Sequence, residues 1–556
     1  MSRISRMVIA VSTAASIAIS FLPAAGAAEP PGNSTWTEHY FPSGDGLTQL
    51  HADVLRPKAL GDKEKTPVIL TVSPYFNHGD SGGGGPSDRF YDFLEETDIL
   101  DRGYTYVMVD LPGFGGSGGC NDWGGLREQA GVKSAVEWAA SQPWSTGKVG
   151  MMGKSYDAWT GLMGMAQKPK GLAAVIAMEP VYAGYRYLYN NGVRFLNSVA
   201  TPALFQVYDA QPGTPQDGPE YNVNGAPQAW CYGVNLGMQQ QDDPESAFWA
   251  ERDLLEAAKG SKVPLFLTQG FLETNTKPDG AFDYFNLMRG DHNRAWYGQF
   301  DHVRGWETNG DGTYLMGRDT FVDEMMRFFD RHVKGLPLNK APVHRDATIE
   351  VQDALGRYRL EPSWPPPDMV MRATKLTTGS YTDDGSNSGA GSGGGQGIWT
   401  ISQPLRHDAW LSGEPRLKVT VDAVPRSNVV GNVYDVAPNG RATLVSRGAF
   451  LVRGAGSQEL EFELYGQDWP LEAGHRVGVL VSGANSEWWT HIPTGTTVTV
   501  SRASIELPFL KKKRTRFVEG EKTTRLKSHL SSAYVEVDDE TVRSSRARFD
   551  LPPRLR

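Results

Sequence analysis

The chain has 556 residues, 39% of them hydrophobic and 21% charged, which is an ordinary composition for a globular protein. One compact core does not accommodate this length, so we expect two or three domains. The formal net charge is −9, and it becomes −11 when residues 1–28, with two arginines and no acid, are set aside. This balance argues against nucleic acid and anionic membrane surfaces as partners.

The first 28 residues have the three-part pattern of a secretory signal peptide. Two arginines precede an apolar stretch from Met7 to Leu22, and small residues at 25–28 offer a cleavage site. No later stretch reaches the roughly eighteen apolar residues that a membrane span needs. We therefore expect a secreted, extracellular protein. Its two cysteines, Cys120 and Cys231, could pair there, but sequence does not give their separation, so the disulfide is left open.

From residue 36 to 345 the pattern predicts an α/β domain. Short continuous apolar runs, typical of strands buried on both faces of a mainly parallel sheet, alternate with segments of helical periodicity. The predicted strands are Val68–Val72, Tyr104–Val109, Val149–Met152, Leu172–Met178, Val263–Thr268 and Ala295–Phe300. Such alternation is typical of a doubly wound sheet with helices on both sides.

Three further segments differ from this rhythm. Residues 181–262 are rich in Tyr, Asn, Gln and Pro and are interpreted as a helical cap insertion that walls a substrate pocket. Residues 346–510 show the period-2 alternation and turn signals of an all-β sandwich or jelly roll, with a glycine- and serine-rich loop at 385–397. The tail, 511–556, has little periodicity and is interpreted as a peripheral C-terminal extension.

Two segments resemble the Gly-x-Ser-x-Gly pattern of a nucleophilic serine. Ser117 gives the better literal match, but several glycines and polar residues separate it from any helix, so we interpret its loop as structural. Ser155, in Gly153-Lys-Ser-Tyr-Asp-Ala158, lies between a predicted strand and a predicted helix, the context of a nucleophile elbow. We therefore predict that Ser155 is the nucleophile and that the Tyr156 N–H faces the oxyanion.

A serine nucleophile needs a base and an orienting acid, which follow it in the order acid, histidine in α/β-hydrolases. His302 lies just past the strand predicted at 295–300, at the edge where the loops of a parallel sheet gather, and is the predicted base. The acid is expected in the loop after the strand at 263–268. Glu273 is nearest the strand end, while Asp279 and Asp283 remain alternatives.

These residues carry a family resemblance. Gly153-Lys-Ser-Tyr156 is similar to the nucleophile motif of the Xaa-Pro dipeptidyl-peptidase and cocaine-esterase family, and the resemblance covers most of the chain. Residues 270–278 resemble the family's acid loop, with Glu273 at its aspartate position, and residues 300–302 resemble its base segment. Ser73-Pro-Tyr75 resembles the segment whose tyrosine hydroxyl completes the oxyanion hole, which implies that role for Tyr75.

Other parts of the resemblance concern structure. Asp110 to Gly118 resembles a family loop in which the serine is structural, although Pro112 stands where the family has arginine. Residues 411–500 resemble the family's C-terminal jelly-roll domain. The resemblance thus implies an α/β-hydrolase domain followed by a jelly roll.

The resemblance implies a serine hydrolase that releases Xaa-Pro dipeptides from peptide N-termini through an acyl-enzyme. The alternative is a carboxylic-ester or amide hydrolase of the cocaine-esterase type. A dipeptidyl-peptidase must bind a free α-amine, and the insertion offers six acids for it: Asp209, Asp217, Glu220, Asp242, Asp243 and Glu245. A different class, a non-catalytic carbohydrate- or wall-binding protein, is disfavoured by the intact order of Ser155, acid and His302. No cluster has metal-ligand spacing, so neither a metal nor another cofactor is expected.

Overall fold

The computed structural model describes residues 29–61, 63–209, 211, 213–224, 229–385, 397–552 and 554–556, with only the backbone at 202 and 229–232. The predicted signal peptide and most of the glycine-rich loop lie outside these residues. The side chain of Cys231 does too, so the pairing of Cys120 with Cys231 is left open here as well. Among the helices described, none is long and apolar enough to cross a bilayer.

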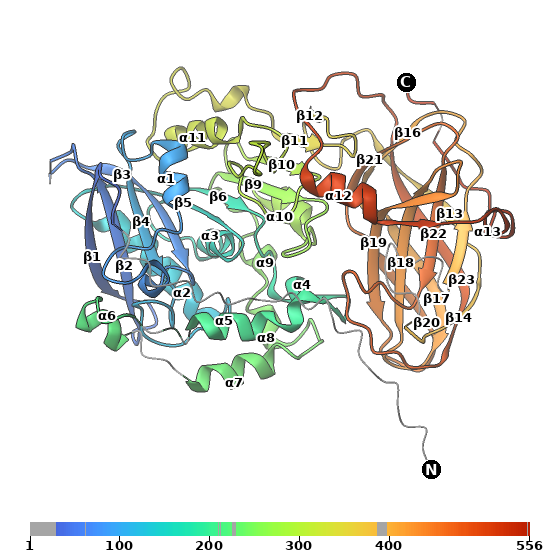
Figure 1. Cartoon of the computed structure of the whole chain (residues 1–556), viewed down its shortest axis with the longest axis horizontal. Coiled ribbons are helices and arrows are strands. Elements are labelled where there is room, and N and C mark those ends of the chain that lie inside the picture. The colour runs from blue at the N-terminus through green and yellow to red at the C-terminus, as the bar shows by residue number, and fades with distance from the viewer. Residues whose placement is uncertain are drawn as a thin grey trace, which may run out of the picture.

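The first domain is built on a ten-stranded sheet that is parallel through its middle, from β4 to β11 (Figure 1). Antiparallel pairs β1–β2, β2–β4 and β11–β12 flank this parallel part. In sheet order the strands are β1 (Ser34–Pro42), β2 (Gln49–Pro57), β4 (Thr105–Asp110), β3 (Thr66–Ser73), β5 (Ser145–Lys154), β6 (Leu172–Met178), β9 (Leu265–Gly270), β10 (Arg294–Gly298), β11 (Ile349–Gln352) and β12 (Tyr358–Glu361).

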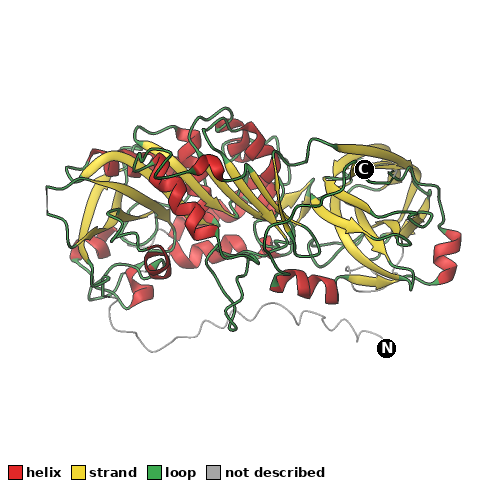
Figure 2. Ribbon diagram, turned by 90° about the horizontal axis from the view of Figure 1, so that it is seen from above, coloured by secondary structure: helices red, strands yellow, loops and turns green. Residues whose placement is uncertain are grey.

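Helices cover both faces of this sheet, as Figure 2 shows. One apolar core contains Val132 and Leu162 from α2 and α3, and the other contains Phe93 and Phe329 from α1 and α11. The helices and short 3-10 turns outside the insertion are η1 (His78–Ser81), α1 (Tyr91–Thr97), α2 (Leu126–Ser141), α3 (Tyr156–Gln167), α10 (Ala281–Leu287), α11 (Phe321–His332) and η3 (Val343–Arg345). The doubly wound α/β prediction is confirmed.

The segment predicted as a cap insertion is largely helical. Most of its described aromatic side chains are buried, and Phe195 stacks against Tyr465 and Trp489 of the second domain. The elements are α4 (Gly184–Leu188), β7 (Tyr189–Asn190), β8 (Val193–Arg194), η2 (Asn197–Val199), α5 (Thr201–Asp209), α6 (Pro219–Asn224), α7 (Ala229–Met238), α8 (Ala247–Ala250) and α9 (Leu254–Ala257).

The second domain is an antiparallel β-sandwich of a seven-stranded and a five-stranded sheet. Its core takes alternate residues of both sheets, such as Val419, Val433 and Val479. The first sheet contains β13 (Met369–Lys375), β14 (Gly379–Thr382), β16 (Ala409–Gly413), β17 (Arg416–Ala423), β20 (Gly456–Glu463), β21 (Gln467–Leu471) and β23 (Thr497–Leu510). The second contains β15 (Gly397–Ile401), β18 (Asn428–Val436), β19 (Arg441–Leu451), β22 (Arg476–Ser482) and β24 (Tyr534–Glu536).

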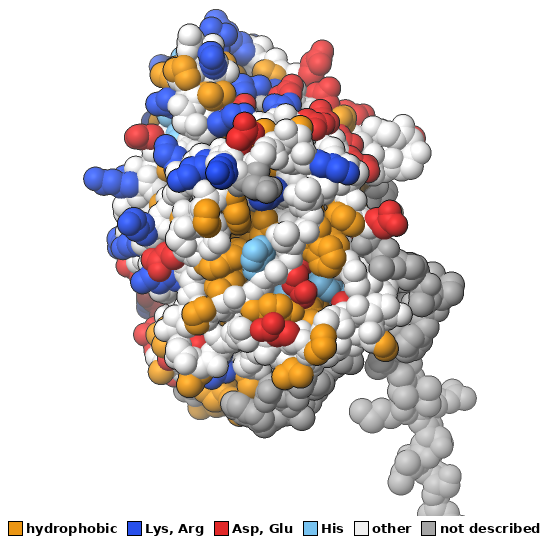
Figure 3. Space-filling view, turned by 90° about the vertical axis from the view of Figure 1, so that its left-hand side faces the viewer, with side chains coloured by type: hydrophobic (Ala, Val, Ile, Leu, Met, Phe, Trp, Pro, Cys, Tyr) orange, Lys and Arg blue, Asp and Glu red, His pale blue; other side chains and the backbone are white. Residues whose placement is uncertain are grey.

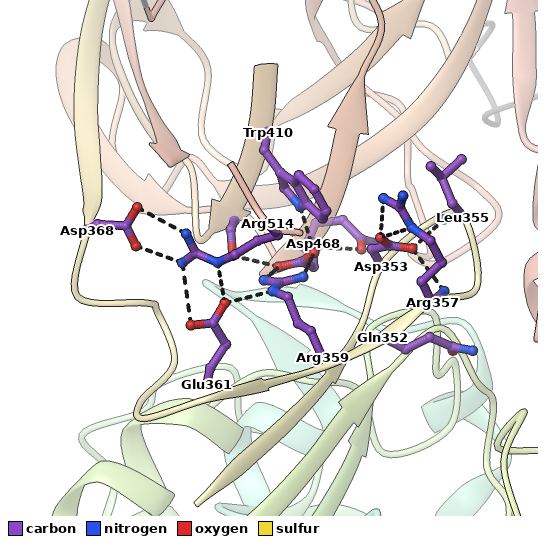
Figure 4. A network of polar contacts seen from close by, with 12 residues as sticks. Gln352, Asp353, Leu355, Arg357, Arg359, Glu361, Asp368, Trp410, Asp468 and Arg514 are labelled. Atoms are coloured by element: carbon purple, nitrogen blue, oxygen red, sulfur yellow. Dashed lines mark hydrogen bonds and ion pairs between the residues drawn. The ribbon is translucent and has the colours of Figure 1, made fainter. Parts of the chain in front are cut away.

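A buried polar network joins the two domains (Figure 4). Arg359 of β12 forms a two-pronged pair with Asp468 of β21, at 2.7 and 2.6 Å, and also bonds Glu361 at 2.7 Å. Arg514 bonds Glu361 at 2.6 Å and Asp368 at 2.7 Å. Because planar guanidinium groups match carboxylates in this geometry, the network fixes the orientation of the sandwich against the first sheet.

Two segments differ from the sequence-based interpretation. Strands β11 and β12, placed by pattern in the all-β region, join the first sheet, where Ile349 and Val351 pack into its core. The tail is not peripheral: it forms α12 (Thr524–Ser532), β24 and α13 (Asp539–Ser544), and β24 pairs with β19. Leu526 and Phe549 enter the core of the sandwich. A short strand or an isolated apolar residue has the same sequence pattern whichever of the two cores it packs into, so the pattern did not assign these segments.

Candidate active site

Ser155 lies at a sharp turn between β5 and α3, at the carboxyl end of a central parallel strand. Its φ of 66° and ψ of −124° are strained for a residue with a side chain. The Ser155 N–H donates to the Met178 carbonyl at the end of β6, and the Ser155 carbonyl accepts from Trp159 N–H, both at 2.9 Å. These bonds hold the strained turn, which is the geometry of a nucleophile elbow.

Small residues around the turn allow the close approach of strand and helix. A Cβ atom at Gly153 would lie 2.4 Å from the Cβ of Asp157, so only glycine fits. Ala158, which replaces the last glycine of the pattern, is completely buried. Alanine is therefore accommodated at position 158, whereas position 153 tolerates no side chain.

His302 and Glu273 follow β10 and β9, which lie next to each other in the sheet. The Glu273 Oε1 is 3.3 Å from the His302 Nδ1. The His302 side chain is 18% exposed and that of Glu273 is fully buried, so the imidazole alone reaches the solvent side. Lys154 Nζ donates to the His302 carbonyl at 3.2 Å, which ties the histidine loop to the residue before Ser155.

The Glu273 carboxylate is held by its own loop. It accepts hydrogen bonds from the N–H groups of Asn275, Thr276 and Lys277 and from the Thr276 hydroxyl, at 2.6–2.9 Å. Burial alone would raise the pKa of Glu273, but the bonds from His302 and Thr276 and the charge of His302 lower it to about 2. The carboxyl group is thus ionised at neutral pH.

The alternative acids are engaged elsewhere. Asp279 bonds Arg186 at 3.1 Å and Asn190 at 3.2 Å, and Asp283 lies 3.5 Å from the same arginine. Of the three carboxylates considered from the sequence, the structure brings Glu273 to His302. This selection required side-chain positions, since all three lie within one loop and the following helix.

The rings of both predicted oxyanion residues pack against Phe205 of α5. The Phe205 ring centroid is 4.8 Å from that of Tyr156 and 6.1 Å from that of Tyr75. Burial raises the pKa of the Tyr75 hydroxyl well above its usual value, which keeps its proton in place. Arg89 stacks 4.0 Å from the Tyr75 ring and bonds Asp157 at 2.9 Å, so the ring is held against α3.

Two buried ionisable residues beside this site were missed from the sequence. Glu179 follows β6 with no exposure, and burial, then the charge of Glu273, raise its pKa well above the usual value. Lys277 is buried beneath Tyr187 and Phe195, and burial lowers its pKa to about 7. The only signal for them in the sequence was position. Glu179 and Lys277 follow the ends of two predicted strands, at the same edge of the sheet as Ser155 and His302.

The structure also explains the second serine motif. The Ser117 hydroxyl donates to the Asp110 carbonyl at 2.8 Å and accepts from the His51 N–H at 2.9 Å. A Cβ at Gly115 would clash with the Asp110 carboxylate at 2.2 Å. Ser117 is 1% exposed, so the loop is structural, as expected.

Three of the acids considered for binding an amine make other contacts. Asp209 accepts from Asn121 at 2.9 Å, Asp217 lies 2.9 Å from His78, and Asp242 lies 3.4 Å from Arg453 of the second domain. These contacts engage all three carboxylates within the protein, although the Oδ1 of Asp209 is buried without a hydrogen bond among the described residues. The residue that would bind a substrate amine is therefore not identified by them.

A parallel α/β sheet with a serine at a strained strand–helix turn, followed by an acid–histidine pair at neighbouring strand ends, defines a serine hydrolase of the α/β-hydrolase class. Comparison with known families agrees with this class. Residues 45–304 match the model of the X-Pro dipeptidyl-peptidase (S15 family), and residues 343–527 match its C-terminal non-catalytic domain. The chain belongs to the S15 family of serine hydrolases.

Individual relatives are distant. A protein of Rhodopirellula baltica named "Putative Xaa-Pro dipeptidyl-peptidase" is 23% identical over 85% of this chain and 87% of its own length. One of the same name from Streptomyces avermitilis is 24% identical over 69% of this chain and 61% of its own length. The Xaa-Pro dipeptidyl-peptidase of Lacticaseibacillus casei is 24% identical over 43% of this chain and 38% of its own.

Solved structures share the fold across both domains. A CocE/NonD family hydrolase from Staphylococcus aureus superposes with a TM-score of 0.66 and 15% identity, over 86% of this chain and 94% of that one. An α-amino acid ester hydrolase gives a TM-score of 0.61 and 17% identity, over 90% and 100%. These likenesses establish the architecture, an α/β-hydrolase domain followed by an antiparallel β domain.

Proposed function

We propose that the protein is a secreted Xaa-Pro dipeptidyl-peptidase that acts through an acyl-enzyme on Ser155. One observation carries the catalytic part: the elbow serine and the Glu273–His302 pair follow β5, β9 and β10, at the same edge of one parallel sheet. The choice of a peptide substrate is supported by the family description and by the names of the relatives.

In this proposal His302 acts as the general base. Its Nε2 takes the proton of the Ser155 hydroxyl as the oxygen attacks the carbonyl carbon, and then gives that proton to the leaving amine. The ionised Glu273 keeps the Nδ1 proton facing itself and stabilises the imidazolium. Water, deprotonated by the same nitrogen, then attacks the acyl-enzyme and releases the dipeptide as an acid.

The negative charge on the carbonyl oxygen needs donors that are already in place. The Tyr156 N–H, at the first turn of α3, and the Tyr75 hydroxyl are proposed for this role, each contributing roughly 3 kcal/mol to transition-state stabilisation. The Phe205 ring packs against both tyrosine rings and would form an apolar wall there. Such a wall suits the ring of a proline residue beside the scissile bond.

An ester or amide hydrolase of the cocaine-esterase type would use the same groups, so substrates must decide between the two. The test compares alanyl-prolyl p-nitroanilide with its N-acetylated form and with p-nitrophenyl acetate and butyrate. A dipeptidyl-peptidase should prefer the unblocked anilide by a large factor in kcat/KM. Preference for the esters would reject the peptidase and select the alternative.

The nucleophile is tested separately. Ser155→Ala should abolish turnover of every substrate, and a fluorophosphonate probe should label the peptide that contains Ser155. Ser141→Ala, at the exposed end of α2, is the matched control and should keep full activity. Labelling of another serine, or turnover by Ser155→Ala, would reject the assignment.

Secretion is supported by the pattern of residues 1–28. Expressed in its native host, the protein should accumulate outside the cytoplasm with an N-terminus at or near Glu29. A full-length cytoplasmic product would reject this part of the proposal and leave the catalytic part untouched.

A further inference from the structure

A second polar cluster lies at the β1–β2 edge of the first sheet, where the mechanism above uses no residue. Two histidines and four carboxylates meet there, contributed by β1, β2, η1, the end of β4 and the segment before α6. They are Glu38, His51, Asp53, His78, Asp110 and Asp217.

Strand geometry brings three of these residues to one face. His51 and Asp53 are two residues apart on β2, so their side chains point to the same side of the sheet. Glu38 of β1 is the register partner of Asp53. His78 begins η1 and reaches the same face from the loop that follows Tyr75.

Each histidine is oriented through its Nδ1 atom by a carboxylate of its own. The His51 Nδ1 is 2.8 Å from Asp110 Oδ2, and the His78 Nδ1 is 2.9 Å from Asp217 Oδ1. The Tyr221 ring stacks on His78 with centroids 4.3 Å apart. A carboxylate on Nδ1 places the proton there and leaves Nε2 as a lone-pair donor, which is the usual support of a metal-binding histidine.

Both Nε2 atoms lie near Asp53, and that of His51 also lies near Glu38. The His78 Nε2 is 2.9 Å from Asp53 Oδ2, and the His51 Nε2 is 3.2 Å from Glu38 Oε1 and 3.8 Å from Asp53 Oδ1. The donor atoms of His51, Asp53 and His78 all lie within 4.8 Å of one another. Zinc bonds of about 2.0–2.2 Å put neighbouring donors of a tetrahedron roughly 3.3–3.6 Å apart, within the 2.9–3.8 Å range of the nitrogen–oxygen contacts above.

We propose that the Nε2 atoms of His51 and His78, with a carboxylate oxygen of Asp53, form a binding site for a divalent transition-metal ion, zinc in the first place. Two imidazoles and a carboxylate are donors that zinc accepts in tetrahedral sites. The fourth position would be taken by water or, after a shift of its side chain, by Glu38, which lies 3.2 Å from the His51 Nε2.

The rival interpretation is a network without metal, in which both histidines are cations. Four ionised carboxylates with two neutral imidazoles carry a local net charge of about −4. A divalent ion and a pair of protons would each reduce that charge by the same two units. A cationic His51 would need an acceptor for its Nε2 proton. The Glu38 Oε1, 3.2 Å away, can serve as that acceptor. The two interpretations therefore differ in what the cluster holds, one divalent ion or two protons, and metal analysis separates them.

The ion would join segments that are distant in sequence. It would fasten η1, and with it the loop that carries Tyr75, to β1 and β2, while Asp217 and Tyr221 extend the contact to the insertion. Glu38 is 28% exposed and gives a path for exchange. Figure 3 shows the surface of this end of the molecule, beneath which His51 and His78 are buried.

Metal analysis of the intact protein tests the proposal. The protein is incubated with zinc and dialysed against metal-free buffer. We then expect about one zinc ion per chain, measured by inductively coupled plasma mass spectrometry. Asp53→Asn keeps the size of the side chain and removes the shared carboxylate, so zinc should fall to background. A buried histidine–carboxylate pair in the second domain, His491 with Asp383 at 2.6 Å, gives the matched control: Asp383→Asn should keep its zinc.

Two further measurements keep the test decisive if Asp53→Asn folds poorly. A strong chelator should lower the Tm of the wild type, and zinc should restore it. Cobalt added to the chelated protein should give the intense visible absorption of a tetrahedral site. A wild type that binds no zinc after loading, equal zinc in Asp53→Asn and wild type, or only the weak absorption of octahedral cobalt would overturn the proposal.

Discussion

Arg525 of α12 donates a hydrogen bond from its Nε to the carbonyl oxygen of Leu272, at 2.9 Å. Leu272 directly precedes Glu273, and the same Arg525 nitrogen lies 3.6 Å from the carboxylate of Asp301, which precedes His302. The C-terminal segment therefore contacts both loops that carry the acid–histidine pair.

This contact predicts a positioning role for Arg525. Arg525→Ala should lower kcat about five-fold, the effect of about 1 kcal/mol for one hydrogen bond, with little change in KM. Lys527→Ala, an exposed change on the same helix, is the control. Steady-state kinetics and Tm are measured on the same variant. If kcat falls only in proportion to a fall in Tm, Arg525 stabilises the fold and does not position the acid–histidine pair.

Glu273→Gln should lower kcat by a factor on the order of 10³–10⁴, because an amide keeps the shape but neither the charge nor a fixed acceptor for the Nδ1 proton. Asp279→Asn should have a small effect, since Asp279 bonds Arg186 and Asn190 instead. The comparison requires kcat/KM at several pH values on one substrate. A larger loss for Asp279→Asn would move the acid to that position.

Tyr75→Phe should reduce kcat by roughly 10²–10³ with little change in Tm, because it removes one proposed oxyanion donor and keeps the ring under Arg89. Tyr91→Phe is a suitable control, since the hydroxyl of Tyr91 makes no hydrogen bond among the described residues. Equal kinetics of Tyr75→Phe and wild type would exclude the hydroxyl from the reaction.

Lys277 makes stability depend on pH. Burial lowers its pKa from 10.5 to about 7 in the folded protein, so between these values the unfolded chain binds a proton that the folded chain lacks. The free energy of unfolding should therefore rise with pH from 7 towards 10.5, by up to about 1.4 kcal/mol per pH unit from this group. Below pH 7 both states are protonated and the cost of burying the charge is fully present.

Lys277→Met should remove this contribution. The variant should gain most relative to the wild type near pH 6, and the difference should shrink as pH rises to 9 or 10. Urea denaturation at each pH measures it, with Lys259→Met, an exposed lysine, as the control that keeps the wild-type slope. A slope in Lys277→Met as steep as that of the wild type would show that another group titrates there.

Much of the fold followed from local pattern. Continuous apolar runs such as Leu172–Met178 became central parallel strands, and the alternation at 417–423 became β17. Membership of the serine hydrolase family was visible in the strand–turn–helix context of Ser155. The choice between Glu273 and Asp279 was not, because both loop positions satisfy the same spacing and only their side-chain directions differ.

What the sequence determined by itself is therefore the local part: which segments bury one face or both, where the chain turns sharply, and which residues stand at strand ends. The tertiary structure decided which distant segments meet. It placed β11 and β12 in the first sheet, set Arg525 against the Glu273 loop, and brought His78 to His51 and Asp53. The physical reason is that periodicity reports burial along one element, whereas these contacts depend on packing between elements, which no short window of sequence contains.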